Sequence, residues 1–348
     1  MKNVIVIGAG LAGLSAAREL TSAGVKVTVL ESGSTAGGRV TSDHIDGYIC
    51  DRGFQVINAR YPHVKATGLI EKLDFQYINP NFRLVSNSIS KTFGRNHPLA
   101  ALTSSPSTTK TALDEFFTGV YLAKPSEVSK SVRREIFRSF PFGKPGVPAG
   151  GVGEFSNALA ENLDIRYQHS VEKVRGRKVQ GPWGELEADA VIVATTAARA
   201  NSILGLYMPQ QMHQSTTWYH STTSQLTNAE LLAVPANSGI VNSVVISQLS
   251  SKYAPAGKNL IATTTLNSIS ESSIKSEIAR LFGAHGSELV SRHEIKESLP
   301  VMTPGSKRPI YRASECVVLA GDYLEIPSQE GAMRSGVKAA KLTLQSMR

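Results

Sequence analysis

The chain has 348 residues, of which 41% are hydrophobic and 19% are charged. This length predicts about two domains, and the composition excludes a wholly disordered protein. The two cysteines, Cys50 and Cys316, form no Cys/His cluster, so they give no signal for a metal and suit a reducing compartment. The net charge of +9 would suit an anionic partner, but no nucleic-acid motif accompanies it, so no nucleic acid is expected.

The chain opens with a strand, a glycine-rich turn and a helix. Residues 3–7 are an apolar run, which is typical of a buried parallel strand. Gly8 permits a tight turn, Gly10 lets the backbone approach a pyrophosphate, and Gly13 lets the next helix pack closely. The N–H groups at the start of this helix would face the phosphates. The predicted contacts of this turn are Gly8, Gly10, Leu11, Ala12 and Gly13.

A second strand is predicted at residues 26–30, and Glu31 follows it directly. The Glu31 carboxylate can accept hydrogen bonds from a ribose diol, and Ser32 lies beside it. The strand, glycine turn, helix and acid together predict a dinucleotide site. Because the same opening serves NAD and FAD, it does not distinguish these two cofactors.

A Gly37-Gly38-Arg39 segment comes shortly after the second strand. The planar guanidinium of Arg39 suits phosphate oxygens, and the other interpretation of this segment is a surface turn. At the far end, residues 316–320 predict another buried strand, followed by Gly321 and Asp322. A helix beginning near Gln329 would then place its positive end at the same ligand. Its predicted contacts are Gly331, Ala332 and Met333.

The middle of the chain contributes further predicted strands. Residues 165–174 alternate apolar and polar side chains, which indicates a half-buried strand containing Val171. Residues 178–188 predict a hairpin, and residues 190–194 predict a buried strand. The candidate ligand contacts here are Val171, Ala194 and Thr195.

These motifs resemble the superfamily of FAD-dependent amine oxidases, protoporphyrinogen oxidases and phytoene desaturases. The resemblance implies an α/β fold with a Rossmann-like FAD-binding domain of the GR2 type, built on a parallel sheet. It also implies a discontinuous second α+β domain that holds the substrate. We expect the FAD-binding domain at 1–55, 148–205 and 296–348, and the substrate domain at 56–147 and 206–295.

The resemblance also implies roles for single residues. Glu31 would bind the ribose, Arg39 would support the pyrophosphate, and Asp322 would accept hydrogen bonds from the ribityl chain. The backbone of Val171 would contact the adenine. The expected neighbours of the flavin ring are Gly53, Phe54 and Gln55. Non-covalent FAD is expected.

The implied reaction is oxidation or desaturation of a C–N or C–C bond by hydride transfer to flavin N5. The substrate would be a small or apolar organic molecule. An NAD-binding dehydrogenase without flavin and a non-catalytic flavoprotein stay open as alternatives. No catalytic residue is predicted, since Lys252 and Lys258 are more typical of a loop. The Trp218-Tyr219 pair is interpreted as core packing rather than a substrate wall.

The expected substrate domain combines a mainly helical first piece with a second piece of strands and a helix. The strands are predicted at 240–247 and 259–265, and the helix at 273–282. Two Ser/Thr-rich segments, 102–111 and 215–227, are expected to be loops or edge segments.

The segment 127–140 predicts a basic amphipathic helix. Such a helix more often faces a core than a bilayer, so peripheral membrane contact is not favoured. The chain has no run of ~18 apolar residues, and its first apolar run carries the glycine turn rather than a signal peptide. We therefore expect a cytoplasmic protein.

Overall fold

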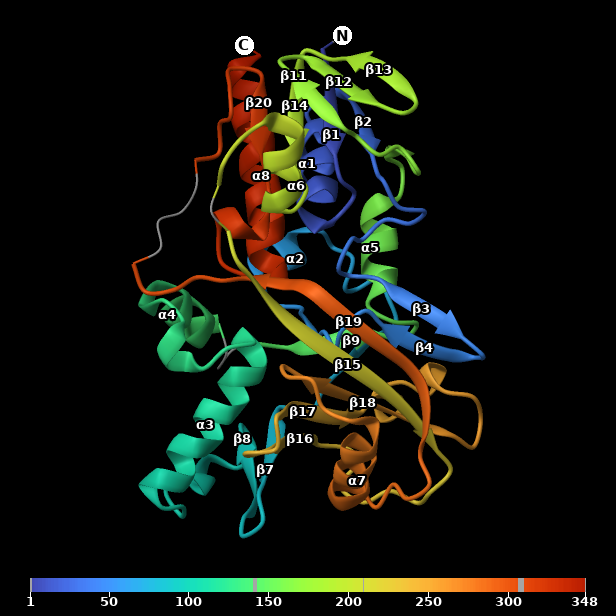
Figure 1. Ribbon diagram of the computed structural model, residues 1–348, viewed down its shortest axis with the longest axis vertical. Coiled ribbons are helices and arrows are strands. Elements are labelled where there is room, and N and C mark those ends of the chain that lie inside the picture. The colour runs from blue at the N-terminus through green and yellow to red at the C-terminus, as the bar shows by residue number, and fades with distance from the viewer. Residues whose placement is uncertain (1, 140–142, 209, 306–309, 348) are drawn as a thin grey trace.

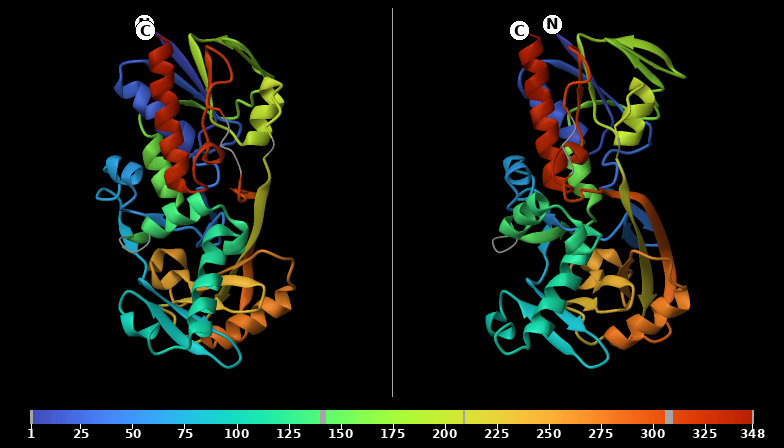
Figure 2. Two further views of the ribbon diagram at one scale, coloured as in Figure 1. Left: turned by 90° about the vertical axis from the view of Figure 1, so that its left-hand side faces the viewer. Right: turned by 60° about the vertical axis from the view of Figure 1, so that its left-hand side comes forward.

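The computed structural model of the chain describes residues 2–139, 143–208, 210–305 and 310–347. Two large sheets lie one above the other along the longest axis, and both termini lie at the end of the first sheet (Figure 1). Two long strands, drawn in yellow and orange, run between the two halves (Figures 1 and 2).

The first sheet has five parallel strands in the order β10-β2-β1-β14-β20. Its strands are β1 (Asn3–Ile7), β2 (Lys26–Leu30), β10 (Asp164–Arg166), β14 (Ala190–Val193) and β20 (Val317–Leu319). The strands predicted from apolar runs at both ends and in the middle of the chain are confirmed as β1, β2, β14 and β20. Strand β14 is buried along its whole length because both faces of the sheet are covered.

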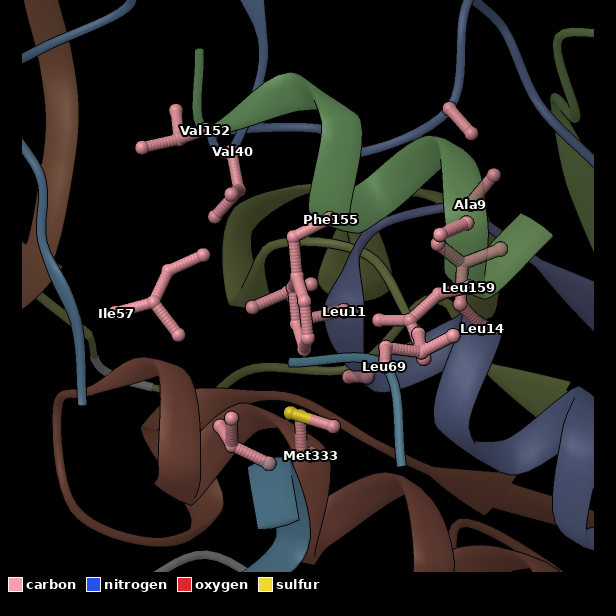
Figure 3. Packing of buried hydrophobic residues seen from close by; sticks show 14 of the residues in the cluster. Ala9, Leu11, Leu14, Val40, Ile57, Leu69, Val152, Phe155, Leu159 and Met333 are labelled. Carbon is pink, nitrogen blue, oxygen red and sulfur yellow. The ribbon is translucent and has the colours of Figure 1, made fainter. Parts of the chain in front are cut away.

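Helices α1 (Leu11–Ser22) and α8 (Gln329–Ser346) pack against each other on one face of this sheet, beside α5 (Gly153–Ala160) (Figures 1 and 2). Figure 3 shows the buried side chains where they meet. They include Leu11, Leu14, Phe155, Leu159 and Met333. This core places the start of α1 and the start of α8 close together, although they come from opposite ends of the chain.

The other face of the sheet is covered by α6 (Ala197–Leu204) and a three-stranded ribbon. The ribbon contains β11 (Lys173–Arg175), β12 (Lys178–Gly181) and β13 (Gly184–Glu187), so the predicted hairpin is confirmed. Helix α6 begins after Thr196, whose hydroxyl accepts the Arg199 N–H, and ends at Gly205 in the left-handed conformation.

The single strand predicted at 165–174 is wrong. Strand β10 ends at Arg166 and β11 begins at Lys173, with Val171 in the irregular segment between them. Gln168 adopts a left-handed φ of 57°, which turns the chain. The N–H groups of Gln168 and His169 then donate to the carbonyls of Gly33 and Glu31. These bonds to the segment after β2 replace strand pairing.

The second sheet has seven strands in the order β19-β15-β18-β17-β16-β7-β8. Its strands are β7 (Asn81–Val85), β8 (Ser90–Gly94), β15 (Met212–Thr222), β16 (Leu232–Pro235), β17 (Ile240–Val245), β18 (Asn259–Thr265) and β19 (Glu288–Pro300). All neighbours are antiparallel except β16 and β7. The predicted strands at 240–247 and 259–265 are confirmed as β17 and β18, and the helix at 273–282 lies within α7 (Glu271–Phe282).

Residues 56–147 contain more helix than strand, as expected, and their strands β7 and β8 complete the second sheet. The Ser/Thr-rich segment 215–227 is no loop or edge: most of it belongs to β15, which lies between β19 and β18. β-Branched Thr and aromatic Trp and Tyr favour a strand, and this preference outweighs the polarity of the segment. The division of the chain into two domains stays a prediction, with β19 crossing the expected boundary at 296.

Shorter elements complete the fold. The strands are β3 (Ser42–Ile45), β4 (Tyr48–Asp51), β5 (Ile57–Asn58), β6 (Phe75–Tyr77) and β9 (Pro145–Pro148), and the helices are α2 (Pro62–Ala66), α3 (Pro106–Tyr121) and α4 (Lys130–Ser139). The 3₁₀ turns are η1 (Pro98–Ala100), η2 (Pro125–Glu127), η3 (Ile246–Gln248), η4 (Ser251–Tyr253) and η5 (Asp322–Leu324). Helix α3 therefore occupies most of the other Ser/Thr-rich segment, 102–111, from Pro106 onward.

Helix α4 confirms the predicted amphipathic helix, whose last expected residue, Phe140, lies outside the described residues. Val132 and Ile136 are buried against α3 and Met302, while Phe137 is 58% exposed. This burial agrees with the predicted core-facing helix, for which membrane contact was not favoured. Among the helices that the structure describes, none is long and apolar enough to cross a bilayer.

Candidate functional site

A cavity of about 500 Å³ lies where the two large sheets meet. Many of its lining residues were predicted as cofactor contacts from the sequence. These are Gly8, Gly10, Leu11, Ala12, Glu31, Ser32, Gly37, Gly38, Arg39, Gly53, Phe54, Gln55, Ala194, Thr195, Gly321, Asp322 and Ala332. The fold thus brings together residues from both ends and the middle of the chain around one space.

The glycine turn is built from close backbone contacts. Gly8 has a φ of +100°, and a Cβ there would lie 2.7 Å from the carbonyl oxygen of Ala194. A Cβ on Gly13 would lie 1.9 Å from the Gly8 oxygen, so only glycine lets α1 sit this close to β1. A Cβ on Gly10 would come no closer than 4.0 Å, to the Gly37 carbonyl oxygen, and Gly10 precedes α1 without a side-chain cap. The first N–H groups of α1 are therefore available to an anion in the cavity.

The Gly37–Gly38 segment packs directly on this turn. The Gly37 N–H donates to the Ala9 carbonyl over 2.8 Å, and Gly10 and Gly37 form an isolated bridge. A Cβ on Gly38 would approach Gly10 Cα to 3.4 Å. The two glycine segments thus form one surface without side chains, which suits close contact with a flat or extended ligand.

Glu31 holds the loops on either side of it. One carboxylate oxygen accepts the Ala9 N–H over 2.7 Å, and the other accepts the Gly33 N–H over 2.7 Å. Glu31 lines the cavity at the end of β2, where a ribose diol could reach the remaining lone pairs.

Arg39 and Asp322 form an ion pair of 2.8 Å across the cavity wall. A second guanidinium nitrogen donates to the Ser298 carbonyl over 2.8 Å, and Gln55 donates to the Arg39 carbonyl. Burial disfavours the charged guanidinium, but the Asp322 carboxylate and the charge of Glu297 outweigh burial and raise the pKa of Arg39. The pair joins the segment after β2 to the segment after β20, which are 283 residues apart.

Four predicted site residues lie outside the cavity lining. Gly13 serves the packing of α1 on β1, and Gly331 packs on Ile326, whose carbonyl oxygen would lie 2.0 Å from an added Cβ. Met333 belongs to the buried core in Figure 3. The Val171 carbonyl accepts a hydrogen bond from Arg199 over 2.6 Å.

The second sheet supplies lining residues that the sequence analysis missed. They are Ser215, Thr217, Thr264, Ile295, Ser298 and Leu299, joined by Leu122 at the end of α3. Residues two apart on a strand share a face. Once β15 is known to be a strand, the spacing of Ser215 and Thr217 therefore indicates that both side chains face the same side. Further missed lining residues are Val40, Arg52, Thr196, Arg199, Ser328 and Gln329.

Other residues weighed from the sequence lie away from the cavity. Lys252 makes an exposed ion pair with Asp74, and the lining that the structure describes includes no lysine or histidine. Trp218 and Tyr219 are buried, as the core interpretation predicted. Burial raises the pKa of the Cys50 thiol to about 12. Among the described residues, no three possible metal ligands lie together.

Comparison with known proteins identifies the family. The profile of the flavin containing amine oxidoreductase family matches residues 11–77 and 81–344. The chain belongs to this family. Its resemblance to amine oxidases, protoporphyrinogen oxidases and phytoene desaturases is therefore confirmed.

Individual relatives match over shorter stretches. Protoporphyrinogen oxidase 2 of Arabidopsis thaliana is 32% identical over 147 residues, which are 40% of this chain and 28% of that protein. Lysine-specific histone demethylase 2 of Homo sapiens is 53% identical over 58 residues, which are 16% of this chain and 7% of that protein. The matched stretch is thus less than two thirds of the length of either relative.

Solved structures share the fold along the whole chain. Cyclohexylamine oxidase from Brevibacterium oxydans has a TM-score of 0.76 at 14% identity, and each chain is covered fully. An oxidoreductase from Methanosarcina mazei has a TM-score of 0.76 at 19% identity, covering 97% of this chain and 99% of that one. The predicted α/β fold class is confirmed.

The cofactor of this family member is FAD, and the cavity fits it. The glycine surface leaves room where side chains would block a pyrophosphate, and the start of α1 offers unpaired N–H groups. The start of α8, capped by the Ser328 hydroxyl, lines the far part of the same cavity through Gln329 and Ala332. A long dinucleotide has binding groups along this whole path.

Proposed function

We propose that the protein is an FAD-dependent oxidoreductase that oxidises or desaturates a C–N or C–C bond of a small organic molecule. The observation that carries this proposal is the single cavity shared by the amino-terminal glycines, the Gly321-Asp322 turn and the second sheet. A nucleotide site alone would not need the second sheet in its wall. Bound FAD would supply the acceptor for a hydride equivalent from the substrate.

The chain's own residues would bind and orient the cofactor without a covalent bond. Gly10 and the start of α1 would hold the pyrophosphate, and Glu31 would hold the ribose. Asp322 would bind the ribityl hydroxyls while its ion pair with Arg39 holds the carboxylate in place. The start of α8 would place a positive dipole end toward the ring, where negative charge collects on reduction. The buried, protonated Cys50 thiol supports non-covalent binding.

The substrate would lie against the second sheet. Phe54, Leu122 and Ile295 give this end apolar surface that excludes water, and Thr217 and Thr264 add hydroxyls. This lining suits a small organic molecule that is apolar over most of its surface. The relatives named protoporphyrinogen oxidase, phytoene desaturase and polyamine oxidase keep porphyrinogen-like, carotenoid-like and amine substrates open.

Purified protein tests the proposal directly. We expect a yellow protein with absorption bands near ~370 and ~450 nm, because oxidised flavin absorbs there and nicotinamide does not. Acid denaturation should release the flavin into the supernatant if it is non-covalent. A panel of amines and dihydro-aromatic compounds, added without oxygen, should include one that bleaches the ~450 nm band. Retained colour with every compound would support a non-catalytic flavoprotein instead.

A further inference from the structure

Arg199 differs from the other arginines that line the cavity in the described part of the chain. Arg39 pairs with Asp322 over 2.8 Å, and Arg52 pairs with Asp43 over 2.9 Å. Arg199 is exposed, and among the described residues it has no carboxylate partner. Its positive charge and its guanidinium surface are therefore open to a ligand in the cavity.

The place of Arg199 in α6 does not serve the helix itself. Arg199 is the third residue of α6, and its N–H donates to the Thr196 hydroxyl that caps the helix. Acidic rather than basic side chains stabilise the positive start of a helix. A Thr cap is usually completed by Glu or Gln at this third position. An arginine there opposes the helix dipole, so its side chain calls for another explanation.

The Arg199 side chain bonds the irregular segment between β10 and β11. One guanidinium nitrogen donates to the Val171 carbonyl over 2.6 Å and to the Ser170 hydroxyl over 3.4 Å. The same segment is held from the other side, because the His169 N–H donates to the Glu31 carbonyl over 2.8 Å. The chain between these bonds spans at most ~10 Å. Arg199 therefore lies at the Glu31 end of the cavity.

This end of the cavity would hold the adenosine part of FAD. Glu31 is the expected contact of the ribose, so the adenine would lie beside it. The Val171 backbone was the expected contact of the adenine, but Val171 lies outside the described lining and its carbonyl already accepts the Arg199 N–H. The exposed guanidinium is therefore the surface that this segment and α6 present to the ligand.

We propose that the Arg199 guanidinium packs against the adenine and sets the affinity for the AMP half of FAD. Planar guanidinium groups stack on aromatic faces, including those of nucleobases. The bonds to Val171 and Ser170 hold the side chain before the ligand arrives, which lowers the entropic cost of binding. This inference rests on the FAD of the proposed function and adds a residue to its binding site.

The test compares ligands that contain different halves of FAD. FAD is FMN joined to AMP, whereas ADP carries the AMP half without the flavin. Full-length apoprotein would be titrated with FAD and with FMN by flavin fluorescence, and ADP would compete with FAD. We expect Arg199→Ala to weaken the binding of FAD and ADP by the same factor, at least about tenfold, because a stacking contact is lost. FMN binding should change by less than about twofold, since FMN does not reach Arg199.

Two further variants separate direct contact from other effects. Arg175→Ala is the matched control, because Arg175 is an exposed arginine of β11 outside the described lining, and it should bind all three ligands as wild type does. Arg199→Lys keeps the charge and a donor for the Val171 carbonyl but removes the planar guanidinium. It should recover no more than about threefold of the FAD affinity that Arg199→Ala loses.

Several outcomes would overturn the inference without touching the proposed function. Unchanged FAD affinity in Arg199→Ala is one, and a loss of FAD affinity that ADP does not share is another. Equal losses for FAD and FMN would show a general distortion of the cavity rather than a lost adenine contact. Wild-type affinity in Arg199→Lys would limit Arg199 to supporting Val171. Wild-type protein that takes up no FAD would instead refute the proposed function itself.

Discussion

Single residues at this site hold several segments at once. Glu31 ties the glycine turn to the segment after β2, and Arg39 ties that region to Ser298 and Asp322. A residue in such a position affects ligand binding both by its own contact and by fixing its neighbours. Substitutions here should therefore lower cofactor affinity more than they lower the stability of the fold.

Replacement of Glu31 by Ala should weaken FAD binding by about 1–3 kcal/mol, since a ribose contact and the carboxylate acceptors of the Ala9 and Gly33 N–H groups are lost. Flavin fluorescence during titration of apoprotein would measure the dissociation constant. Glu187→Ala, at an exposed position of β13, is the control and should bind FAD normally. An unchanged affinity in Glu31→Ala would remove Glu31 from the cofactor site.

His220 makes the stability depend on pH. It is fully buried on the face of β15 beneath α7, and both ring nitrogens lack partners among the described residues. Burial lowers the pKa of His220 to about 4, while Glu271 opposes and Lys275 reinforces the effect. The unfolded chain therefore binds a proton near pH 6.5 that the folded chain does not. The contribution of neutral His220 to stability is complete above that pH and is lost as the pH falls toward 4.

Wild-type protein loses unfolding free energy at acid pH because His220 is buried, and replacement of His220 by Leu should remove up to about 3 kcal/mol of this loss. Urea unfolding at several pH values between 4 and 7 would measure it. Exposed His97→Ala should follow the wild-type profile. Asp51 acts in the opposite direction, because burial raises the pKa of its carboxyl to about 6. The informative quantity is therefore the difference in unfolding free energy between wild type and His220→Leu at each pH. Parallel profiles for wild type and His220→Leu would contradict the assignment.

At the scale of elements, the pair α1 and α8 begins at one cavity, although the two helices come from opposite ends of the sequence. Gly336 of α8 faces α1 so closely that a Cβ would lie 2.1 Å from the Ala12 carbonyl oxygen. Ala12 itself lines the cavity. The spacing of the two helices is therefore coupled to the shape of the cofactor site.

Replacement of Gly336 by Ala should destabilise the protein by about 1–3 kcal/mol through overpacking, which exceeds the ~1 kcal/mol that Ala gains as a helix former. It should also weaken FAD binding, because Ala12 must move. Denaturant unfolding and FAD titration would measure the two effects. Gln345→Ala, exposed on the same helix, should change neither by more than about 0.5 kcal/mol. A stabilised Gly336→Ala protein would refute this packing.

At the scale of the molecule, the buried Asp51 joins the two halves. Its carboxylate accepts hydrogen bonds from Ser42, from the Val152 N–H and from the Tyr253 hydroxyl at 2.6, 3.1 and 2.8 Å. Its carbonyl accepts the Tyr219 hydroxyl of β15. Asp51 thus holds β4 against the second sheet, beside the Gly53–Gln55 segment of the cavity.

Replacement of Tyr253 by Phe should cost about 1–3 kcal/mol of stability, because a buried carboxylate loses a donor. The loss should grow as the pH rises above about 6, since Asp51 is then ionised in the folded protein. Thermal unfolding at pH 5 and pH 8 would measure this. Tyr207→Phe, with Tyr207 93% exposed, is the control. An equal loss of stability at pH 5 and pH 8 would show that the Tyr253 hydroxyl does not stabilise the charge on Asp51.

The cofactor half was predictable because its signals are local. Gly8, Gly10 and Gly13 follow an apolar run, and Glu31 ends the next one, so spacing alone indicates the dinucleotide turn. The substrate half has weaker signals. The Ser/Thr-rich part of β15 suggested a loop, because propensity in strands depends on the neighbours with which each residue packs. Val171 shows the same limit, since hydrogen bonds from Gln168 and His169 to the segment after β2 break its predicted strand.

The sequence by itself determined the family, the parallel sheet and the glycine turn, because neighbouring residues create them through backbone geometry. Only the tertiary structure decided that Arg39 pairs with Asp322 and that β15 and β18 line the cavity. These features depend on contacts between residues far apart in the chain. Pairing and burial across such distances follow from the packing of whole sheets and helices, which no local pattern encodes.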